Sequence, residues 1–172
     1  MTIAYLGLGS NLGDSLQILR DAVVCLAHYP NITVLRKAGI YLSSPVDTQG
    51  ADFFNTVVSV ETVLAAEQLY AICMQIECQF ERKRPYRYAP RTLDMDVLLF
   101  GEQVMSSPTL TVPHPRMIER AFVLLPLAEI AENIELPGLG HIQQFLPTVA
   151  QQKIRRMSLT DANVFDNELI SL

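Results

Sequence analysis

The 172-residue sequence has few charged residues, which make up 18% of the chain, and only three cysteines. Low charge together with 49% hydrophobic residues excludes a disordered segment and indicates one globular domain with a continuous core. No apolar run approaches the ~20 residues of a membrane span, and no secretory signal pattern follows Met1. We therefore expect a cytoplasmic protein with no membrane partner.

The cysteines and the net charge exclude two further classes. Cys25, Cys73 and Cys78 each fall in an apolar, periodic segment. Their odd number and positions predict buried free thiols rather than disulfides or metal ligands. The net charge of −5 argues against bulk nucleic-acid binding, because that binding depends on Lys and Arg neutralising phosphates. We expect a monomer with no nucleic-acid partner.

Residues 91–100, Arg-Thr-Leu-Asp-Met-Asp-Val-Leu-Leu-Phe, place two carboxylates in an otherwise apolar strand. Side chains alternate along a strand, so Asp94 and Asp96 share one face, roughly 7 Å apart, while the odd-numbered residues from Leu93 to Leu99 share the other. Two carboxylates this close repel each other unless a cation lies between them. Magnesium is held by one or two carboxylates plus substrate phosphates, so the pair suggests phosphate chemistry with two metal ions. A solvated strand face is the alternative interpretation.

Residues 82–91 read Arg-Lys-Arg-Pro-Tyr-Arg-Tyr-Ala-Pro-Arg and concentrate cations directly before the acidic pair. Guanidinium groups hold phosphate oxygens bidentately and stay charged at any working pH. Pro85 and Pro90 exclude a regular helix, which predicts a loop. Beside a metal-binding pair this loop fits a polyphosphate; by itself it would be a solvated basic loop.

The rest of the pattern predicts strands and helices in the order β-α-β-β-α-β. We expect strands over 3–8, 32–42, 53–61 and 91–100, and a hairpin turn at 101–102 that leads to 107–112. We expect one helix capped by Asp14 and ended by 29–31, and a second over 65–80. A short helix over 122–130, interrupted at Pro126, and a last helix over 142–150 follow. This order, with the C-terminal elements appended, predicts an α+β, ferredoxin-like fold in which helices pack on an antiparallel sheet.

Three features have both a plain and a functional interpretation. The glycines of segment 7–14 do not have the spacing of a dinucleotide-binding fingerprint, and we interpret the segment as a structural turn. Phe53 and Asn55 share one face of a strand. In the functional interpretation a flat heterocycle stacks on Phe53 and hydrogen-bonds to Asn55; in the plain one Phe53 is a core residue beside a turn-forming Asn55. Prolines on both sides fix His114, which is a site residue or an ordinary surface histidine.

Four blocks, in this order and spacing, resemble the 6-hydroxymethyl-7,8-dihydropterin pyrophosphokinase family. They are Gly-Ser-Asn-Leu-Gly-Asp at 9–14, Phe53-x-Asn55, Arg-Thr-Leu-Asp-Met-Asp at 91–96, and Val-Pro-His-Pro-Arg at 112–116 with Arg120-x-Phe122. The resemblance covers residues 3–150. It implies transfer of the β,γ-diphosphate of ATP to the hydroxymethyl group of 6-hydroxymethyl-7,8-dihydropterin, with release of AMP, in folate biosynthesis. We expect a catalytic domain over 1–150, an extension of unknown role over 151–172, and a stand-alone enzyme.

The resemblance implies roles for the matching positions. Asp94 and Asp96 would bind two Mg²⁺ ions, and Arg82 and Arg91 would neutralise the diphosphate as it moves. The ATP-binding residues would be Glu77, Arg82, Arg84, Arg91, Thr111, His114 and Arg120. The pterin-binding residues would be Ser43, Pro45, Val46, Phe53, Asn55 and Phe122, with the ring between the two phenylalanines. Loops 43–52 and 82–90 would close over both substrates.

Four positions depart from the family pattern: Phe53, Tyr88 and Ala89, where tyrosine, tryptophan and glycine are common, and Met74, where some members have a polar residue. The basic loop is also one residue shorter than in some members. Loop closure is therefore the least transferable part of the resemblance. Two rival functions remain open. A two-metal nucleotidyl or phosphodiester enzyme would use the same acidic pair. An RNA-binding module would stack bases on the aromatic residues of segment 82–91, although the two carboxylates would repel its phosphates.

Overall fold

A computed structural model describes residues 1–44, 51–80 and 92–158, and within them a six-stranded sheet forms the centre of the molecule. Its strands are β1 (Thr2–Ser10), β2 (Ile32–Lys37), β3 (Tyr41–Ser43), β4 (Phe53–Thr62), β5 (Asp94–Phe100) and β10 (Ile154–Arg156). They run in the order β10-β3-β4-β1-β5, with β2 also paired to β4, and every pair is antiparallel.

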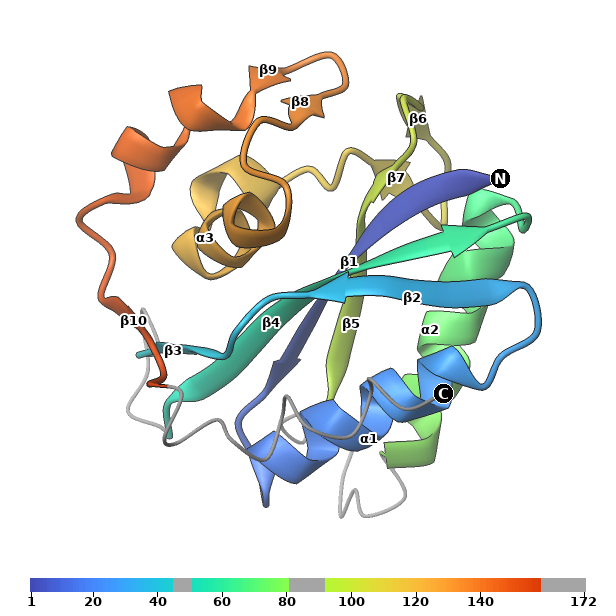
Figure 1. The fold of residues 1–172 in the computed structure, drawn as a ribbon, viewed down its shortest axis with the longest axis horizontal. Helices are drawn as coiled ribbons and strands as arrows, with labels where there is room; N and C mark the ends of the chain where they lie inside the picture. Colours follow the sequence, from blue (N-terminus) through green and yellow to red (C-terminus); the bar gives the residue numbers. More distant parts are fainter. Residues whose placement is uncertain (45–50, 81–91, 159–172) are drawn as a thin grey trace.

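Helices cover both faces of this sheet. Helices α1 (Ser15–Ala27) and α2 (Ala66–Phe80) lie on one face, and α3 (Ala121–Ile130) lies on the other (Figure 1). The buried residues accordingly form two clusters, one beneath α1 and α2 and one beneath α3. The predicted α+β class, with helices packed on an antiparallel sheet, is confirmed. In the described residues no helix has the length and apolar character needed to cross a membrane.

Helix α1 begins and ends where the sequence predicts. The Asp14 carboxylate accepts a hydrogen bond from the backbone N–H of Gln17 at 3.1 Å, which satisfies one of the free donors of the first turn. Gly13 has φ 71° and makes the turn into the helix. Beyond Ala27, Asn31 takes a left-handed conformation with φ 67° and reverses the chain towards β2.

The single strand predicted over 32–42 is wrong, because the chain forms two strands that pair with successive parts of β4. The N–H of Ala38 still donates to the carbonyl of Val57 at 2.8 Å, but side chains take the next two backbone groups. Thr56 Oγ1 donates to the carbonyl of Ala38 at 3.0 Å, and the N–H of Gly39 donates to Glu129 Oε1 at 3.1 Å. Backbone groups bonded to side chains cannot extend the ladder, so β2 and β3 are separate.

Strand β5 confirms the predicted alternation over its first half only. Met95 and Val97 belong to the cluster beneath α1 and α2, on the face opposite the two aspartates. The register against β1 then shifts, because Leu6 is opposite Val97 whereas Tyr5 is opposite Leu99. This bulge turns Leu99 into the cluster beneath α3, so its predicted place beside Met95 is wrong.

Of three predictions for the chain after β5, two are wrong and one is wrong in part. Helix α3 continues through Pro126, because burial of Leu124 and Leu127 on both sides of it stabilises the two turns. The helix expected over 142–150 is instead two short 3₁₀ turns, η2 (Ile142–Gln144) and η3 (Leu146–Val149), and Pro147 lacks the N–H that a continuous α-helix needs. The third prediction is right about the turn, because Gly101 and Glu102 form one with Gly101 at φ 53°, but the hairpin beyond it pairs β6 (Met105–Ser106) with β7 (Thr111–Val112).

The segment after α3 wraps around that helix and returns to the sheet (Figure 1). It passes through a small hairpin of β8 (Glu135–Leu136) and β9 (Gly140–His141) and then through η2 and η3. Its last strand, β10, pairs with β3 at the end of the sheet. The two strands are also joined to α3, because Glu129 accepts hydrogen bonds from Tyr41 Oη at 2.7 Å and from Arg156 Nη2 at 2.8 Å.

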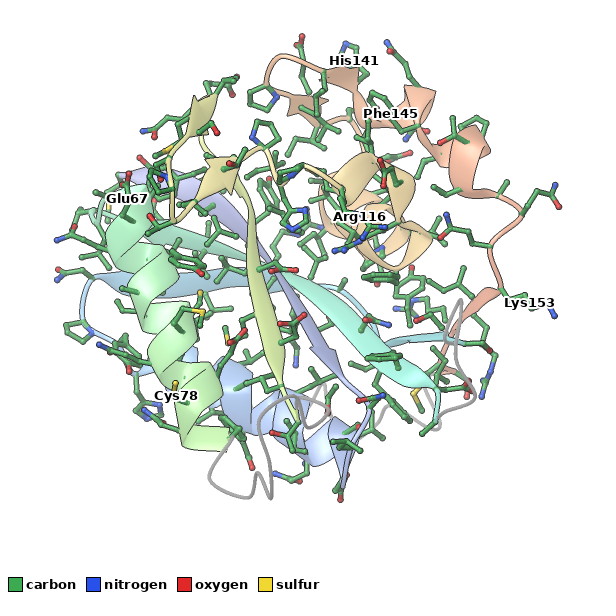
Figure 2. The ribbon with its side chains drawn as sticks, turned by 180° about the vertical axis from the view of Figure 1, so that it is seen from behind. Glu67, Cys78, Arg116, His141, Phe145 and Lys153 are labelled. Atoms are coloured by element: carbon green, nitrogen blue, oxygen red, sulfur yellow. The ribbon has the colours of Figure 1, made fainter. Side chains whose placement is uncertain are left out.

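The three cysteines are free thiols, as predicted, but they are not all buried. Cys73 is fully buried beneath β5, and burial raises its pKa to about 12. Cys25 is half-buried, whereas Cys78 lies exposed on the outer surface of α2 (Figure 2). The prediction of burial fails at Cys78, because that residue falls on the solvent side of the helical period.

Candidate active site

A cavity of about 850 Å³ opens on the α3 face of the sheet, where the ends of β1, β4 and β5 meet the start of α3 and the chain leading to β10. Seven predicted site residues from four separate segments line it together, namely Ser43, Phe53, Asn55, Asp94, Asp96, Arg120 and Phe122. The residues predicted for the metal, the nucleotide and the pterin thus share one space.

The floor of the cavity is made by strand β1, which runs between β4 and β5. Gly9 lies opposite Asn55 on one side and Asp94 on the other, and Gly7 lies between Val57 and Asp96 in the same way. Neither glycine has a side chain to fill the face it presents. The two glycines therefore leave a hollow between the amide of β4 and the carboxylates of β5.

The side chains of Arg120 and His114, which both follow β5 in the chain, approach the Asp96 carboxylate. Arg120 Nη1 lies 4.0 Å from Asp96 Oδ2, and His114 Nε2 lies 3.8 Å from the same oxygen. Asp96 is 40% exposed and Arg120 is 25% exposed, so these are contacts at the cavity wall and not a closed ion pair. Both partners are in reach of an anionic group bound beside the carboxylates.

His114 is held by the backbone around it. Its N–H donates to the carbonyl of Leu98 at 2.8 Å, and its ring Nδ1 accepts from the N–H of Arg116 at 3.2 Å. Burial lowers the pKa of His114, against the opposing effect of the Asp96 charge. A neutral ring that accepts at Nδ1 carries its proton on Nε2, the atom that points towards Asp96. His114 can therefore donate a hydrogen bond into this region without carrying a full charge.

The other end of the cavity presents two aromatic rings and an amide. Phe53 is 36% exposed and Phe122 is partly buried, and the guanidinium of Arg120 lies 5.5 Å from the Phe122 ring centre. Asn55 is buried at 5% exposure, and its Nδ2 donates to Ser43 Oγ at 3.0 Å and to the carbonyl of Phe53 at 3.2 Å. Its two amide protons are engaged by the protein, so Asn55 offers a ligand its carbonyl oxygen.

Three predicted residues are not among those that line the cavity: His114, which approaches Asp96 from outside the lining, Glu77 and Thr111. Glu77 is 2% exposed on α2, and its Oε1 accepts a hydrogen bond from the backbone N–H of Met95 at 2.6 Å. It therefore supports β5 from beneath, between the positions of the two aspartates. Thr111 lies in β7, with its hydroxyl 3.2 Å from that of Ser106. Five further predicted residues fall outside the described part of the chain: Pro45, Val46, Arg82, Arg84 and Arg91.

The cavity also has lining residues that sequence reasoning missed. Gly9 was predicted to lie in a turn, and Gly7 at the end of the strand that leads into it. Both lie inside strand β1, and Asn11 follows them at the rim. Residues 151–154 line the opposite wall, although no motif marks them. The signal for the glycines was their alternation with apolar residues, which is typical of a strand that another group approaches closely. Lys153 extends outward from the edge of the molecule (Figure 2).

The residues at the cavity fit a magnesium ion that is completed by substrate. No cluster of three or more His, Cys, Asp or Glu side chains that could hold a metal occurs in residues 1–44, 51–80 and 92–158. A pair of carboxylates on one wall of a roomy cavity is instead what Mg²⁺ uses when phosphate oxygens and water supply its other ligands. Asp94 and Asp96 provide that pair.

Comparisons with known proteins show which family the chain resembles over most of its length. The family model for 7,8-dihydro-6-hydroxymethylpterin-pyrophosphokinase matches residues 5–132. A Bacillus subtilis protein named 2-amino-4-hydroxy-6-hydroxymethyldihydropteridine pyrophosphokinase is 44% identical over 134 residues, which are 77% of this chain and 80% of that protein. A Pseudomonas aeruginosa protein of the same name is 36% identical over 154 residues, covering 89% of this chain and 95% of its own.

A solved structure of Plasmodium falciparum HPPK-DHPS, the A437G form with SDX-DHP, has a TM-score of 0.70 and 14% identity, covering 97% of this chain but only 48% of that one. At that identity the likeness shows the fold alone. The matches in sequence carry the assignment: this chain is an enzyme, and it belongs to the 7,8-dihydro-6-hydroxymethylpterin-pyrophosphokinase family.

Proposed function

We propose that this enzyme transfers the β,γ-diphosphate of ATP to the hydroxymethyl group of 6-hydroxymethyl-7,8-dihydropterin, with Mg²⁺, and releases AMP in folate biosynthesis. One observation carries the proposal. The carboxylate pair Asp94 and Asp96 shares a single cavity with Phe53, Asn55 and Phe122, so a metal-bound polyphosphate and a flat ring fit side by side. The family assignment supports the same substrates.

The ring end of the cavity would bind the pterin. Phe53 and Phe122 would stack on its faces, which suits a planar heterocycle with an apolar surface and a polar edge. The free carbonyl oxygen of Asn55 would accept a hydrogen bond from that edge, because the amide nitrogen already donates to Ser43 and to the backbone. Ser43, Pro45 and Val46 would complete this part of the pocket.

The acidic end would bind the nucleotide. Asp94 and Asp96 would hold two Mg²⁺ ions, which when bound neutralise the phosphate oxygens and orient the reacting groups. Arg120 and His114 reach the same region and would hold phosphate oxygens through charge and through the Nε2 proton. Arg82, Arg84 and Arg91 would add guanidinium groups from segment 82–91, while Glu77 and Thr111 would support the nucleotide site.

The reaction is an in-line displacement at the β-phosphorus. The hydroxymethyl oxygen of the pterin attacks, the bond from β-phosphorus to the bridging oxygen of the α-phosphate breaks, and the electron pair leaves with AMP. The hydroxyl proton passes to an aspartate or to water. Arg82 and Arg91 would stabilise the charge that spreads over the diphosphate as it moves. Positioning the two substrates in one cavity supplies much of the rate.

We also assign the core to the ferredoxin-like class and expect a monomer in the cytoplasm that binds neither nucleic acid nor membrane. The strand order β5-β1-β4 with β2 and β3 on the far side supports that class, and the net charge of −5 supports the absence of a nucleic-acid partner.

Product analysis tests the proposal. The enzyme is incubated with ATP, Mg²⁺ and 6-hydroxymethyl-7,8-dihydropterin, and the products are separated by ion-exchange chromatography. We expect AMP and a diphosphorylated pterin in equal amounts, and none of either when the pterin is omitted. Release of pyrophosphate from ATP, or cleavage of added RNA or DNA, would instead favour the two-metal nucleotidyl or phosphodiester enzyme.

A further inference from the structure

Arg120 lies at an abrupt change of backbone direction. The 3₁₀ turn η1 (Met117–Glu119) ends directly before it and helix α3 begins directly after it, at Ala121. Arg120 itself is extended, with φ −120° and ψ 110°. The direction in which its side chain leaves the backbone therefore depends on the two peptide groups that flank this one residue.

The start of α3 has no cap from its own neighbourhood, since the Arg120 side chain makes no capping hydrogen bond. The first N–H groups of a helix need acceptors from elsewhere. Gln152, 31 residues further along the chain, supplies one: its Oε1 accepts from the backbone N–H of Ala121 at 2.9 Å. This bond satisfies the first free donor of the helix, whereas a capping side chain directly before a helix accepts from its second or third N–H.

The same amide makes a second bond on the other side of Arg120. Gln152 Nε2 donates to the carbonyl of Glu119 at 2.7 Å, at the end of η1. One side chain thus bridges the last carbonyl before Arg120 and the first N–H after it. Because both ends of the amide are used, the bend at Arg120 cannot open without breaking two hydrogen bonds.

We propose that Gln152 is a positioning residue, which fixes the backbone on both sides of Arg120 and so holds the Arg120 guanidinium at the cavity wall. That guanidinium lies 4.0 Å from Asp96 Oδ2 and 5.5 Å from the centre of the Phe122 ring, so it joins the acidic end of the cavity to the aromatic end. The inference gives the segment after residue 150 a part in the site. Its kinetic consequence rests on the proposed function of Arg120 in binding ATP.

The test compares three variants. Gln152→Met keeps the length of the side chain and loses both hydrogen bonds, and Gln152→Glu keeps an acceptor for Ala121 but loses the donor to Glu119. We expect Gln152→Met to raise the KM for ATP about tenfold, with a smaller rise for Gln152→Glu, because displacement of a binding group weakens binding before it alters the fold. Gln143→Met is the matched control.

Gln143 suits this purpose because it makes the same kind of bond away from the cavity. Its Nε2 donates to the carbonyl of Glu132 at 2.8 Å, and its side chain is exposed. Gln143→Met should leave the KM for ATP unchanged. An equal rise in both Met variants would mean a general loss of stability and would overturn the inference.

A double-mutant cycle separates positioning from a merely structural role. If Gln152 acts through Arg120, then adding Gln152→Met to Arg120→Ala should raise the KM for ATP no further. A further rise of the same size as in the wild-type background would overturn the inference, because Gln152 would then act by another route.

An NMR measurement tests the geometry without substrate or turnover. Amide hydrogen exchange at Ala121 should be faster in Gln152→Met than in wild type, and the amide shifts of Arg120 and Phe122 should change, whereas Gln143→Met should alter neither. Unchanged exchange at Ala121 would overturn the positioning role even in an active enzyme. If wild type transfers no diphosphate but the exchange changes as expected, the proposed function fails and the positioning role stands.

Discussion

The two faces of the sheet use the same strands for opposite purposes. On β5, Met95 is 1% exposed and belongs to the core beneath α1 and α2, whereas Asp94 and Asp96 on either side of it line the cavity. On β1, Leu8 packs into the same core while Gly7 and Gly9 form the cavity floor. A step of one residue along a strand thus separates a side chain that stabilises the fold from one that can act on a substrate.

The first prediction removes a carboxylate from the cavity face. Asp96→Ala should lower the rate of AMP formation on the order of 10³-fold, because it removes a metal ligand, with no loss of stability, because it relieves repulsion with Asp94. Initial rates and thermal unfolding measure the two effects. Turnover near that of wild type would contradict the metal-binding role.

The second prediction makes the matched change on the core face. Met95→Ala should lower the free energy of unfolding by about 3 kcal/mol, since it leaves a cavity among fully buried side chains. Its kcat per folded molecule should stay close to that of wild type. Urea unfolding and active-site titration with nucleotide give the two numbers. A loss of turnover as large as that of Asp96→Ala would mean that the faces are not independent.

The third prediction fills the hollow at the cavity floor. A methyl group at Gly9 would approach Asn55 Oδ1 at 3.1 Å, so Gly9→Ala should displace that oxygen and raise the KM for the pterin about tenfold. A methyl group at Gly7 would meet Leu98 at an ordinary 3.5 Å, so Gly7→Ala should raise it less. Steady-state kinetics with the pterin varied would detect the difference. Equal effects of both changes would argue against the role given to Asn55.

The fourth prediction concerns the charged contact that joins α3 to β3 and β10. Burial alone would raise the pKa of Glu129, but hydrogen bonds from Arg156, Tyr41 and Gly39 lower it overall. A lowered carboxyl pKa in the folded protein adds stability above the unfolded value of about 4.3, and that stability disappears as the pH falls through the folded value. Glu129→Gln should therefore destabilise the protein by about 1 kcal/mol at pH 7 and by less in acid.

Urea unfolding of both proteins from pH 7 to pH 3 would measure this difference, with the exposed Glu135→Gln as the control. The curves of wild type and Glu129→Gln should converge as the pH falls, because protonated Glu129 has no charge for Arg156 to bind. A difference that persists unchanged at pH 3 would show that the contact stabilises by shape and not by charge.

Local patterns predicted much of the fold and the polar part of the site. The Asp14 cap, the helical period of α2 and the alternation of Asp94 and Asp96 with apolar residues all depend on neighbours within a few positions, and the structure agrees with each. The prediction failed where a distant partner intervened. Glu129 takes the N–H of Gly39 from 90 residues away and helps to divide a predicted strand in two.

The amino-acid sequence by itself determined which residues could bind metal, phosphate and a flat ring, because those capacities belong to the side chains and their spacing along a strand. Only the tertiary structure decided that they meet in one cavity, that Gly7 and Gly9 form its floor, and that Gln152 caps the helix beside Arg120. The physical reason is that these contacts join segments far apart in the chain. Their formation depends on the packing of the whole sheet and of the chain that wraps around α3, which no local pattern specifies.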